Sequence, residues 1–305
     1  MKGKVNTMMR ENFDEYKDMI NDHLLDYIPS IDTKSSALYE SMKYSLTAGG
    51  KRLRSVLLLA ACEFAGGNAN NALPYACAIE YIHTYSLIHD DLPSMDNDDL
   101  RRGMPTNHKV YGEGIATLAG DGLLTTAFEV INRDMLMYFD SIQELRKRIN
   151  ASYAIAYGAG VRGMVAGQVS DIESEHKQCS NEMLEYIHLN KTGALIVAAV
   201  RAGLYLGGAD ELMMKNLTCY AENLGLAYQI ADDILDVKGD PQELGKKTNA
   251  DAEHEKVTYV SLNGLSASEQ KLEELTQSAV ENIEEYYDNA EFFRDLVLVL
   301  SKRTK

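Results

Sequence analysis

The sequence is poor in the residues that mark disulfide-rich or segmented proteins. It has four cysteines in 305 residues. They are widely scattered and form no C-x-x-C pair, which predicts free thiols in a reducing compartment. No Ser/Gly-rich linker divides the chain, and no repeat recurs at the spacing of a solenoid. We therefore expect a single domain over residues 1–305.

Long apolar runs and basic residues are also scarce. No apolar run approaches 18 residues, since the run from Gly193 to Val200 stops at Arg201, so we expect no membrane span. Residues 1–10 lack the apolar core of a signal peptide, which favours a cytoplasmic protein. The chain has 30 Lys and Arg but 46 Asp and Glu, and the resulting net charge of −16 argues against nucleic acid as a partner. Such a chain can receive an anionic substrate only where cations gather locally.

Strand signals are missing as well. We find no alternation of apolar and polar residues bounded by a hairpin turn. The five prolines all suit helix ends. Apolar residues instead recur every three or four positions, as in Phe13, Tyr16, Ile20 and Leu24, which places them on one face of an amphipathic helix. The sequence therefore predicts an all-α fold of many helices.

Two dense groups of carboxylates stand out against this background. Each follows an apolar stretch that is typical of a helix; they are Asp90, Asp91 and Asp96, and Asp232, Asp233 and Asp236. Carboxylates this close repel one another unless cations lie between them. Hard oxygen ligands with no Cys or His interleaved favour Mg²⁺ or Mn²⁺ over zinc, and Mg²⁺ commonly shares its remaining ligands with substrate phosphates.

The spacing within the two groups differs. Asp232 and Asp236 are four residues apart and share one face of a helix. Asp90 and Asp96 are six apart, about 600° of helical rotation, so an unbroken helix would separate them. Pro93 disfavours regular helix between them and predicts a local bulge that returns Asp96 to Asp90.

Basic residues lie near both groups in sequence. They form five sets: Lys51, Arg52 and Arg54; Arg101 and Arg102; Lys191; Lys246 and Lys247; and Lys256. Planar Arg side chains suit bidentate phosphate contacts, and Lys supplies a mobile point charge. Together with the aspartates, they predict an enzyme that handles a diphosphate through metal ions.

At these motifs the sequence resembles the trans-prenyl diphosphate synthases of the short-chain bacterial type, and among them the farnesyl diphosphate synthases. The matching segments are residues 49–54, 83–91, 98–103, 118–121, 163–168, 191–193 and 228–236. The resemblance implies an all-α helical bundle of the isoprenoid-synthase type around a deep central cavity, in a homodimer. It departs at Tyr228, where the family commonly has Phe, and at Ser55, where Pro is frequent.

The resemblance also implies the ligands of the metal ions. It gives Asp90, Asp96 and Asp232 as the main ligands, with Asp91, Asp233 and Asp236 in support. The cofactor implied is Mg²⁺, three ions per active site, with Mn²⁺ as the open alternative.

Roles for the other site residues follow from the same resemblance. The allylic diphosphate would be held by Arg101, Lys191 and Lys246, and isopentenyl diphosphate by Lys51, Arg54, His83 and Arg102. The allylic carbocation would be stabilised by Thr192 and Gln229, and substrate would also be bound by Lys256. The implied reaction condenses isopentenyl diphosphate with dimethylallyl and then geranyl diphosphate to give (2E,6E)-farnesyl diphosphate.

Product length is interpreted from Tyr85, five residues before Asp90. A large ring there would form the floor of the tail cavity and stop growth at fifteen carbons, as an aromatic residue does in the farnesyl-type relatives. A geranylgeranyl diphosphate synthase is the alternative. A terpene cyclase would not need Lys51, Arg54 and Arg102 for a second diphosphate, and a non-catalytic partner subunit would typically lose aspartates from one group.

Overall fold

The computed structural model describes residues 2–29, 33–175, 177, 179–238 and 257–302. The chain forms two compact units. The N-terminal unit comprises Phe13–Tyr153 and Ala202–Gly208, and the C-terminal unit comprises Met1–Asn12, Ala154–Arg201 and Ala209–Lys305. The expectation of a single domain over residues 1–305 stays a prediction.

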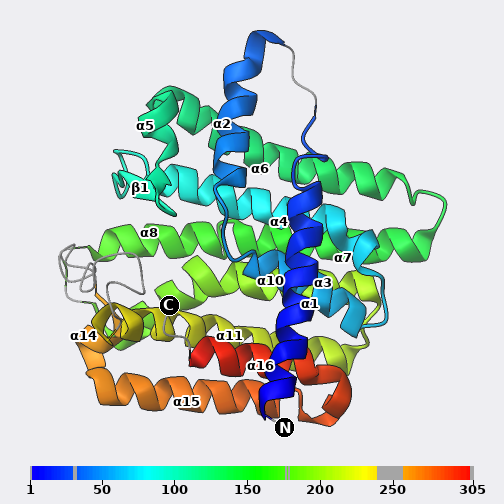
Figure 1. Cartoon of the computed structure of the whole chain (residues 1–305), viewed down its shortest axis with the longest axis vertical. Helices are drawn as coiled ribbons and strands as arrows, with labels where there is room; N and C mark the ends of the chain where they lie inside the picture. Colours follow the sequence, from blue (N-terminus) through cyan, green and yellow to red (C-terminus); the bar gives the residue numbers. More distant parts are fainter. Residues whose placement is uncertain (1, 30–32, 176, 178, 239–256, 303–305) are drawn as a thin grey trace. The chain divides into compact units, whose positions relative to one another are not determined.

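Helices build almost all of the N-terminal unit (Figure 1). In chain order its elements are α1 (Lys2–His23, shared with the other unit), η1 (Thr33–Ser35), α2 (Ser36–Thr47), α3 (Leu53–Phe64), α4 (Ala69–Asp90), β1 (Leu100–Arg101), β2 (Met104–Pro105), α5 (Asn107–Tyr111), α6 (Glu113–Leu136) and α7 (Ile142–Ala159, also shared). Within the described ranges, β1 and β2 are the only strands; they pair antiparallel, Leu100 with Pro105 and Arg101 with Met104. The all-α prediction is confirmed.

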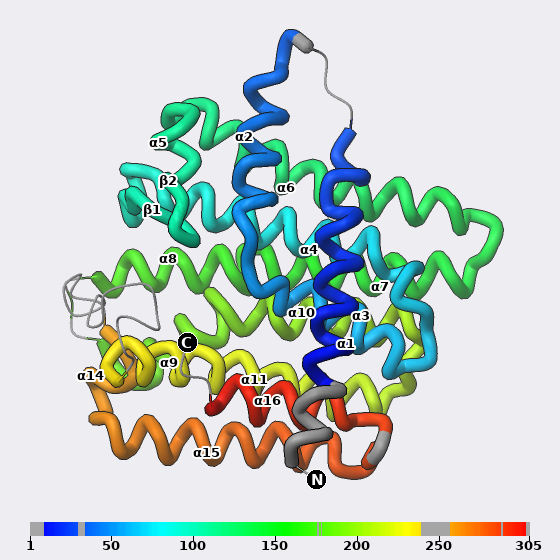
Figure 2. The backbone as a smooth tube through the Cα atoms, viewed as in Figure 1, coloured from blue at the N-terminus to red at the C-terminus, as the bar shows by residue number. Residues whose placement is uncertain are grey.

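Helix α4 is the central element of this unit because it is buried around most of its circumference. It packs against α3 and α6. Its last turn leads into a loop and then into the β1–β2 pair and α5, as the chain path in Figure 2 shows. Because α4 is buried along most of its length, the packing of the helix fixes the position of its last residue, Asp90.

Helix α6 is long and apolar enough to cross a membrane by length and composition alone, and it is the one described helix that meets both criteria. Its Ala116, Ala119 and Leu123 are fully buried. Because a core helix of a globular unit passes the same test, this helix is weak evidence for a span.

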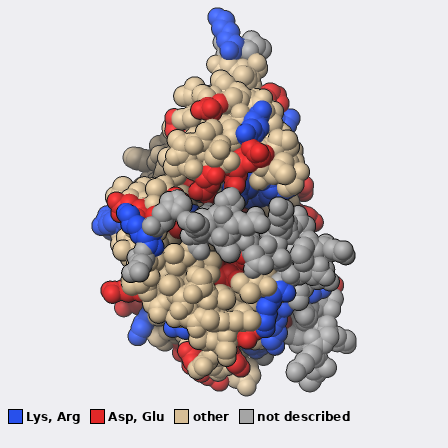
Figure 3. Space-filling model, turned by 90° about the vertical axis from the view of Figure 1, so that its left-hand side faces the viewer, with Lys and Arg blue, Asp and Glu red and all other residues tan. Residues whose placement is uncertain are grey.

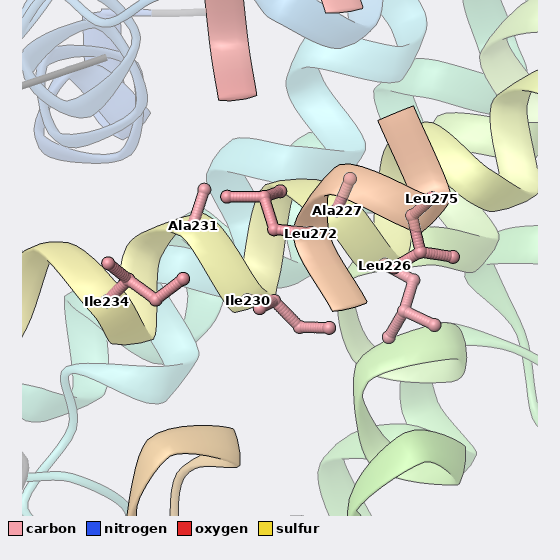
Figure 4. Packing of buried hydrophobic residues seen from close by; sticks show 7 residues of the cluster. All are labelled: Leu226, Ala227, Ile230, Ala231, Ile234, Leu272 and Leu275. Atoms are coloured by element: carbon pink, nitrogen blue, oxygen red, sulfur yellow. The ribbon is translucent and has the colours of Figure 1, made fainter. Parts of the chain in front are cut away.

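Helices form all of the regular secondary structure in the described part of the C-terminal unit. Its elements are α8 (Met164–Ser174), α9 (Asn181–Ile187), the π-helix η2 (His188–Gly193), α10 (Ala194–Gly207, whose end belongs to the other unit), α11 (Glu211–Lys238), α14 (Tyr259–Asn263), α15 (Leu265–Glu281), η3 (Glu284–Ala290) and α16 (Glu291–Ser301). Helices α11 and α15 pack through a cluster of aliphatic side chains (Figure 4): Leu226, Ala227, Ile230, Ala231, Ile234, Leu272 and Leu275. This packing fixes the helix that carries the second aspartate group.

Candidate active site

The first aspartate group lies where α4 ends. Asp90 is the last residue of the helix, and the backbone N–H of Asp96 donates to the carbonyl oxygen of Asp90 at 2.9 Å. Asn97 closes the same turn in a left-handed conformation, with φ of +52°, and donates to the carbonyl of Leu92. The bulge predicted from Pro93 is therefore confirmed, and it brings the backbones of Asp90 and Asp96 together.

Asp91 forms an ion pair with a basic side chain of the β1–β2 pair. Its side chain is buried, and Arg101 of β1 donates to its Oδ1 from Nε at 2.9 Å and also from Nη2. Nη2 of Arg101 also contacts Oδ2 of Asp98 at 2.9 Å. Burial raises the pKa of the Asp91 carboxyl, and the adjacent Arg101 opposes that rise. The β1–β2 pair thus attaches the first aspartate group to a basic side chain.

Tyr85 and His89 occupy the turn of α4 before Asp90. Their rings meet edge to face at 5.7 Å, and Tyr85 is 8% exposed. Burial, and then the charge of Asp90, raise the pKa of Tyr85. His89 Nε2 lies 3.0 Å from the carbonyl oxygen of Thr117, and a Cβ at Gly120 would fall 2.1 Å from the same nitrogen. His89 therefore joins α4 to α6, which requires glycine on α6.

The basic segment after α2 is built on unusual backbone. Gly49, Gly50 and Arg52 all have positive φ, of 86°, 128° and 54°. Nη1 of Arg102 donates to the carbonyl of Gly49, and a Cβ at Gly50 would lie 2.7 Å from the guanidinium carbon of Arg102. Arg102 itself has φ of +55°, and its guanidinium packs against Gly49 and Gly50, where a larger residue at position 50 would collide with it. Lys51 is exposed beside this contact.

His83 lies close to several arginine side chains, which affect its pKa. Burial, and then the charges of Arg54 and Arg102, lower the pKa of His83 well below its ordinary 6.5. The imidazole is therefore neutral near pH 7. The structure brings together three of the four residues predicted to hold isopentenyl diphosphate, and Lys51 adjoins them in the chain.

A small cavity of about 30 Å³ lies beside this cluster, with room for a water molecule. Thr84, Asp91, Arg101 and Arg102 contribute to its wall. The Oγ1 of Thr84 is buried and has no hydrogen-bond partner in the described part of the chain. Thr84 lies within the family-like segment 83–91, but no role was predicted for it from the sequence.

The second aspartate group lies on α11. Asp232 is exposed, whereas Asp233 and Asp236 are buried. Oδ2 of Asp233 accepts from the backbone N–H of Tyr259 at 2.7 Å, at the start of α14, and lies 3.9 Å from Nε2 of His188. Asp233 therefore anchors α14 to α11, which leaves Asp232 as the accessible carboxylate of the pair.

Lys191 and Thr192 lie in the π-helix η2. Nζ of Lys191 donates to Oδ2 of Asp171, on α8, at 2.5 Å. A Cβ at Gly167 would fall 2.1 Å from the backbone nitrogen of Lys191, and a Cβ at Gly225 would fall 2.9 Å from Gly193 Cα. Two glycines therefore let α8 and α11 approach this turn closely.

Other predicted residues are less informative. Gln229 is half-buried on α11. Lys246 and Lys256 lie outside the described residues. Asp171 and Gln168 were missed as site candidates. Gln168 ends the family-like segment 163–168, and its Nε2 has no partner among the residues described; Asp171 lies three residues beyond that segment. A signal existed for them, since Asp171 lies one helical turn after Gln168.

The described residues contain no group of three or more His, Cys, Asp or Glu side chains arranged to hold a metal ion by themselves. On the face in Figure 3, acidic and basic side chains are interspersed rather than segregated. The donor chemistry, carboxylate oxygens beside cations, fits Mg²⁺ that shares its shell with substrate phosphates.

Comparison with known proteins identifies the family. Residues 35–291 match the polyprenyl synthetase family model, and the chain belongs to that family. It is 48% identical over 258 residues to the farnesyl diphosphate synthase of Geobacillus stearothermophilus, covering 85% of each chain. It is 46% identical over 276 residues to the geranylgeranyl diphosphate synthase of Cyanophora paradoxa, covering 90% of this chain and 89% of the relative.

A solved structure agrees with this assignment. The apo crystal structure of an FPP/GFPP synthase from Zymomonas mobilis superposes with a TM-score of 0.81 at 32% identity, covering 98% of this chain and 100% of that one. The fold is the all-α isoprenoid-synthase fold, as predicted. The chain is a trans-prenyl diphosphate synthase, and hence a prenyltransferase of isoprenoid synthesis.

Proposed function

We propose that the protein is a farnesyl diphosphate synthase that adds isopentenyl diphosphate to dimethylallyl diphosphate and then to geranyl diphosphate. The observation that carries this proposal is the cluster of Arg54, Arg102 and His83, joined through Arg101 to the first aspartate group. An enzyme that binds only one diphosphate has no use for this second set of cations. The cluster therefore favours a condensing synthase over a cyclase.

Each residue has a task in this reaction. Arg54 and Arg102, with Lys51, bind the diphosphate of isopentenyl diphosphate, and His83 offers them a neutral neighbour rather than a further repelling charge. Lys191 and Arg101 bind the allylic diphosphate, for which Lys191 exchanges its contact with Asp171. Thr192 and Gln229 present oxygen atoms to the allylic cation, which reacts with isopentenyl diphosphate only if water that would quench it is excluded.

Mg²⁺ is the proposed cofactor, held mainly by Asp90, Asp96 and Asp232. When bound, the ions neutralise the charge that develops on the departing diphosphate. The proposal is supported by the carboxylate donors and by Asp232 being exposed while Asp233 and Asp236 are buried. Mn²⁺ has the same preference for oxygen ligands and is the alternative.

The fifteen-carbon product is proposed from Tyr85, whose ring is buried beside the turn that carries Asp90. Geranylgeranyl diphosphate is the second candidate, because relatives of similar identity carry both names. Separation of products made from labelled isopentenyl diphosphate and dimethylallyl diphosphate tests the choice. Mainly twenty-carbon product rejects the farnesyl assignment and retains the prenyl synthase.

We also propose that the enzyme is a cytoplasmic homodimer. Large apolar side chains are exposed around the end of α6 and the start of α7: Leu136, Met137, Phe139 and Ile142 are 72, 79, 75 and 63% exposed. Exposed apolar groups gathered in this way mark association surfaces. Light scattering of the purified protein tests the dimer, and Phe139→Glu should weaken it.

The cytoplasmic location is proposed from the cysteines. All four cysteines are free, which suits a reducing compartment.

A further inference from the structure

Arg52 belongs to the basic motif by sequence, but its surroundings are those of an interior residue. It is 4% exposed, and its guanidinium points at three separate acceptors. Nε donates to Asn21 at 3.1 Å, Nη1 to Glu80 at 2.7 Å, and Nη2 to the carbonyl oxygen of Leu46 at 2.7 Å. With every nitrogen of its fork engaged in the protein, Arg52 is not arranged to receive a substrate.

Glu80 completes a network under the turn. It is 1% exposed on α4, and its second oxygen, Oε2, lies 2.9 Å from the hydroxyl of Ser55. The same hydroxyl lies 2.9 Å from the carbonyl oxygen of Ala76. Arg52, Glu80 and Ser55 thus form a buried triad that connects the beginning of α3 to the middle of α4.

The triad explains how an unfavourable backbone is maintained. Arg52 has φ of +54°, in the left-handed region that side chains other than glycine rarely adopt. Such a conformation persists only where the surroundings over-determine it. The three acceptor atoms that fix the Arg52 side chain supply that constraint. Lys51 precedes Arg52 directly, and Arg54 follows it by two residues.

The triad also bears on the charge of the cluster. Burial lowers the pKa of both His83 and Arg102, and the charge of Arg52 adds to both shifts. Glu80 opposes the lowering of the Arg102 pKa. Glu80 is therefore the buried negative charge that offsets the mutual repulsion of the arginines. Without it, the guanidinium groups would have to separate or bind counterions before a substrate arrives.

We propose that Arg52, Glu80 and Ser55 are positioning residues that hold the turn bearing Lys51 and Arg54 in its diphosphate-receiving shape without touching the substrate. The inference rests on the proposed function for the identity of the substrate, isopentenyl diphosphate. The cation cluster itself is expected to bind any diphosphate anion, so inorganic pyrophosphate serves as a probe that does not depend on catalysis.

The test is a titration of the full chain with pyrophosphate in the presence of a chelator, so that metal ions at the aspartates contribute nothing. The paired change Arg52→Met with Glu80→Met removes both buried charges together and avoids leaving one unpaired. We expect its Kd for pyrophosphate to rise about tenfold or more, because misplacement by about 1 Å is costly at such sites. Ser55→Ala, which keeps the ion pair, should raise Kd by a smaller factor.

Arg148→Met is the matched control. Arg148 is equally buried, bonds to Asp134 at 3.0 Å and Glu144 at 2.6 Å, and lies near Cys62, at the opposite end of α3 from Arg52. It should lower the melting temperature and leave Kd within about twofold of wild type, since stability and local geometry are separate readouts. If the paired variant does not fold, Ser55→Ala decides.

Three results overturn the inference: unchanged affinity in the paired and Ser55 variants, an equal loss in Arg148→Met, or wild-type protein that does not bind pyrophosphate. In the condensation assay the KM for isopentenyl diphosphate should rise about tenfold in the paired variant and the allylic KM should change by less than about twofold. Wild-type protein that binds pyrophosphate but does not condense the two substrates refutes the proposed function and leaves the positioning role standing.

Discussion

Arg101 donates to the carboxylate of Asp91 from two of its nitrogens, so the second aspartate of the first group is bound by the protein itself. Asp90 and Asp96 are instead brought together by the backbone bond between them. We therefore expect adjacent residues of one motif to have different roles, with Asp91 orienting a cation and Asp90 binding the proposed metal ion.

This difference predicts different responses to metal. Asp90→Asn should raise the Mg²⁺ concentration needed for half-maximal rate, and added Mg²⁺ should restore part of the activity. Asp91→Asn should also slow turnover, because Arg101 loses its charge-assisted partner, but excess Mg²⁺ should not restore it. Rates measured across a Mg²⁺ titration compare the two variants, and equal rescue of both would refute separate roles.

The metal requirement has its own test. Asp232→Ala should abolish condensation and leave the far-ultraviolet circular dichroism spectrum unchanged, because Asp232 is exposed and the core of α11 is aliphatic. Chelation should stop turnover of the wild type and weaken binding of the allylic diphosphate. Full activity after thorough chelation, or in Asp90→Ala, contradicts the assignment.

The two substrate pockets should respond differently to loss of arginine. Arg54→Ala or Arg102→Ala should raise the KM for isopentenyl diphosphate by about 10- to 100-fold, since a charge-assisted contact contributes roughly 1.5–3 kcal/mol. The allylic KM should change much less. Steady-state kinetics with each substrate varied in turn measures both values, and equal effects would mean that the pocket is misassigned.

Removal of the Tyr85 ring should lengthen the product. Tyr85→Ala opens space next to the last turn of α4, so growth should continue to twenty carbons or more. Tyr85→Phe keeps the ring and should keep the fifteen-carbon product. Chromatography of the dephosphorylated products distinguishes these outcomes; an unchanged length in Tyr85→Ala would show that another residue limits growth.

Stability should fall in mild acid because of His83. The pKa of His83 in the folded protein is well below 6.5. As the pH drops below about 6.5, His83 therefore binds a proton in the unfolded chain but not in the folded protein. The free energy of unfolding should then fall by at most about 1.4 kcal/mol per pH unit for this residue. His83→Gln does not titrate, so urea unfolding between pH 5 and 7 should show a shallower slope. Identical slopes would contradict the shift.

Local rules were sufficient to predict some of these features from the sequence. The period of three to four residues identified the helices, and Pro93 located the bulge because proline disfavours regular helix. The expectation that all five prolines suit helix ends was wrong for Pro74, which lies inside α4. The β1–β2 pair was missed, since strands of two residues have no detectable alternation. Arg52 was noted only as one of the basic residues near the aspartates, and its buried ion pair was not predicted because its partner Glu80 is 28 residues away. Lys191 and Asp171 are 20 residues apart in the sequence, so local spacing could not predict their contact either.

The π-helix His188–Gly193 makes the chain sensitive to length at this point. Its hydrogen bonds span five residues instead of four, so it contains one residue more than regular helix would need. Deleting one residue would restore an α-helix and rotate α9 by about 100° relative to α10. Leu184 and Ile187, now buried, would leave their packing positions to polar neighbours. Insertions and deletions should therefore be far more damaging in this segment than substitutions of its exposed side chains.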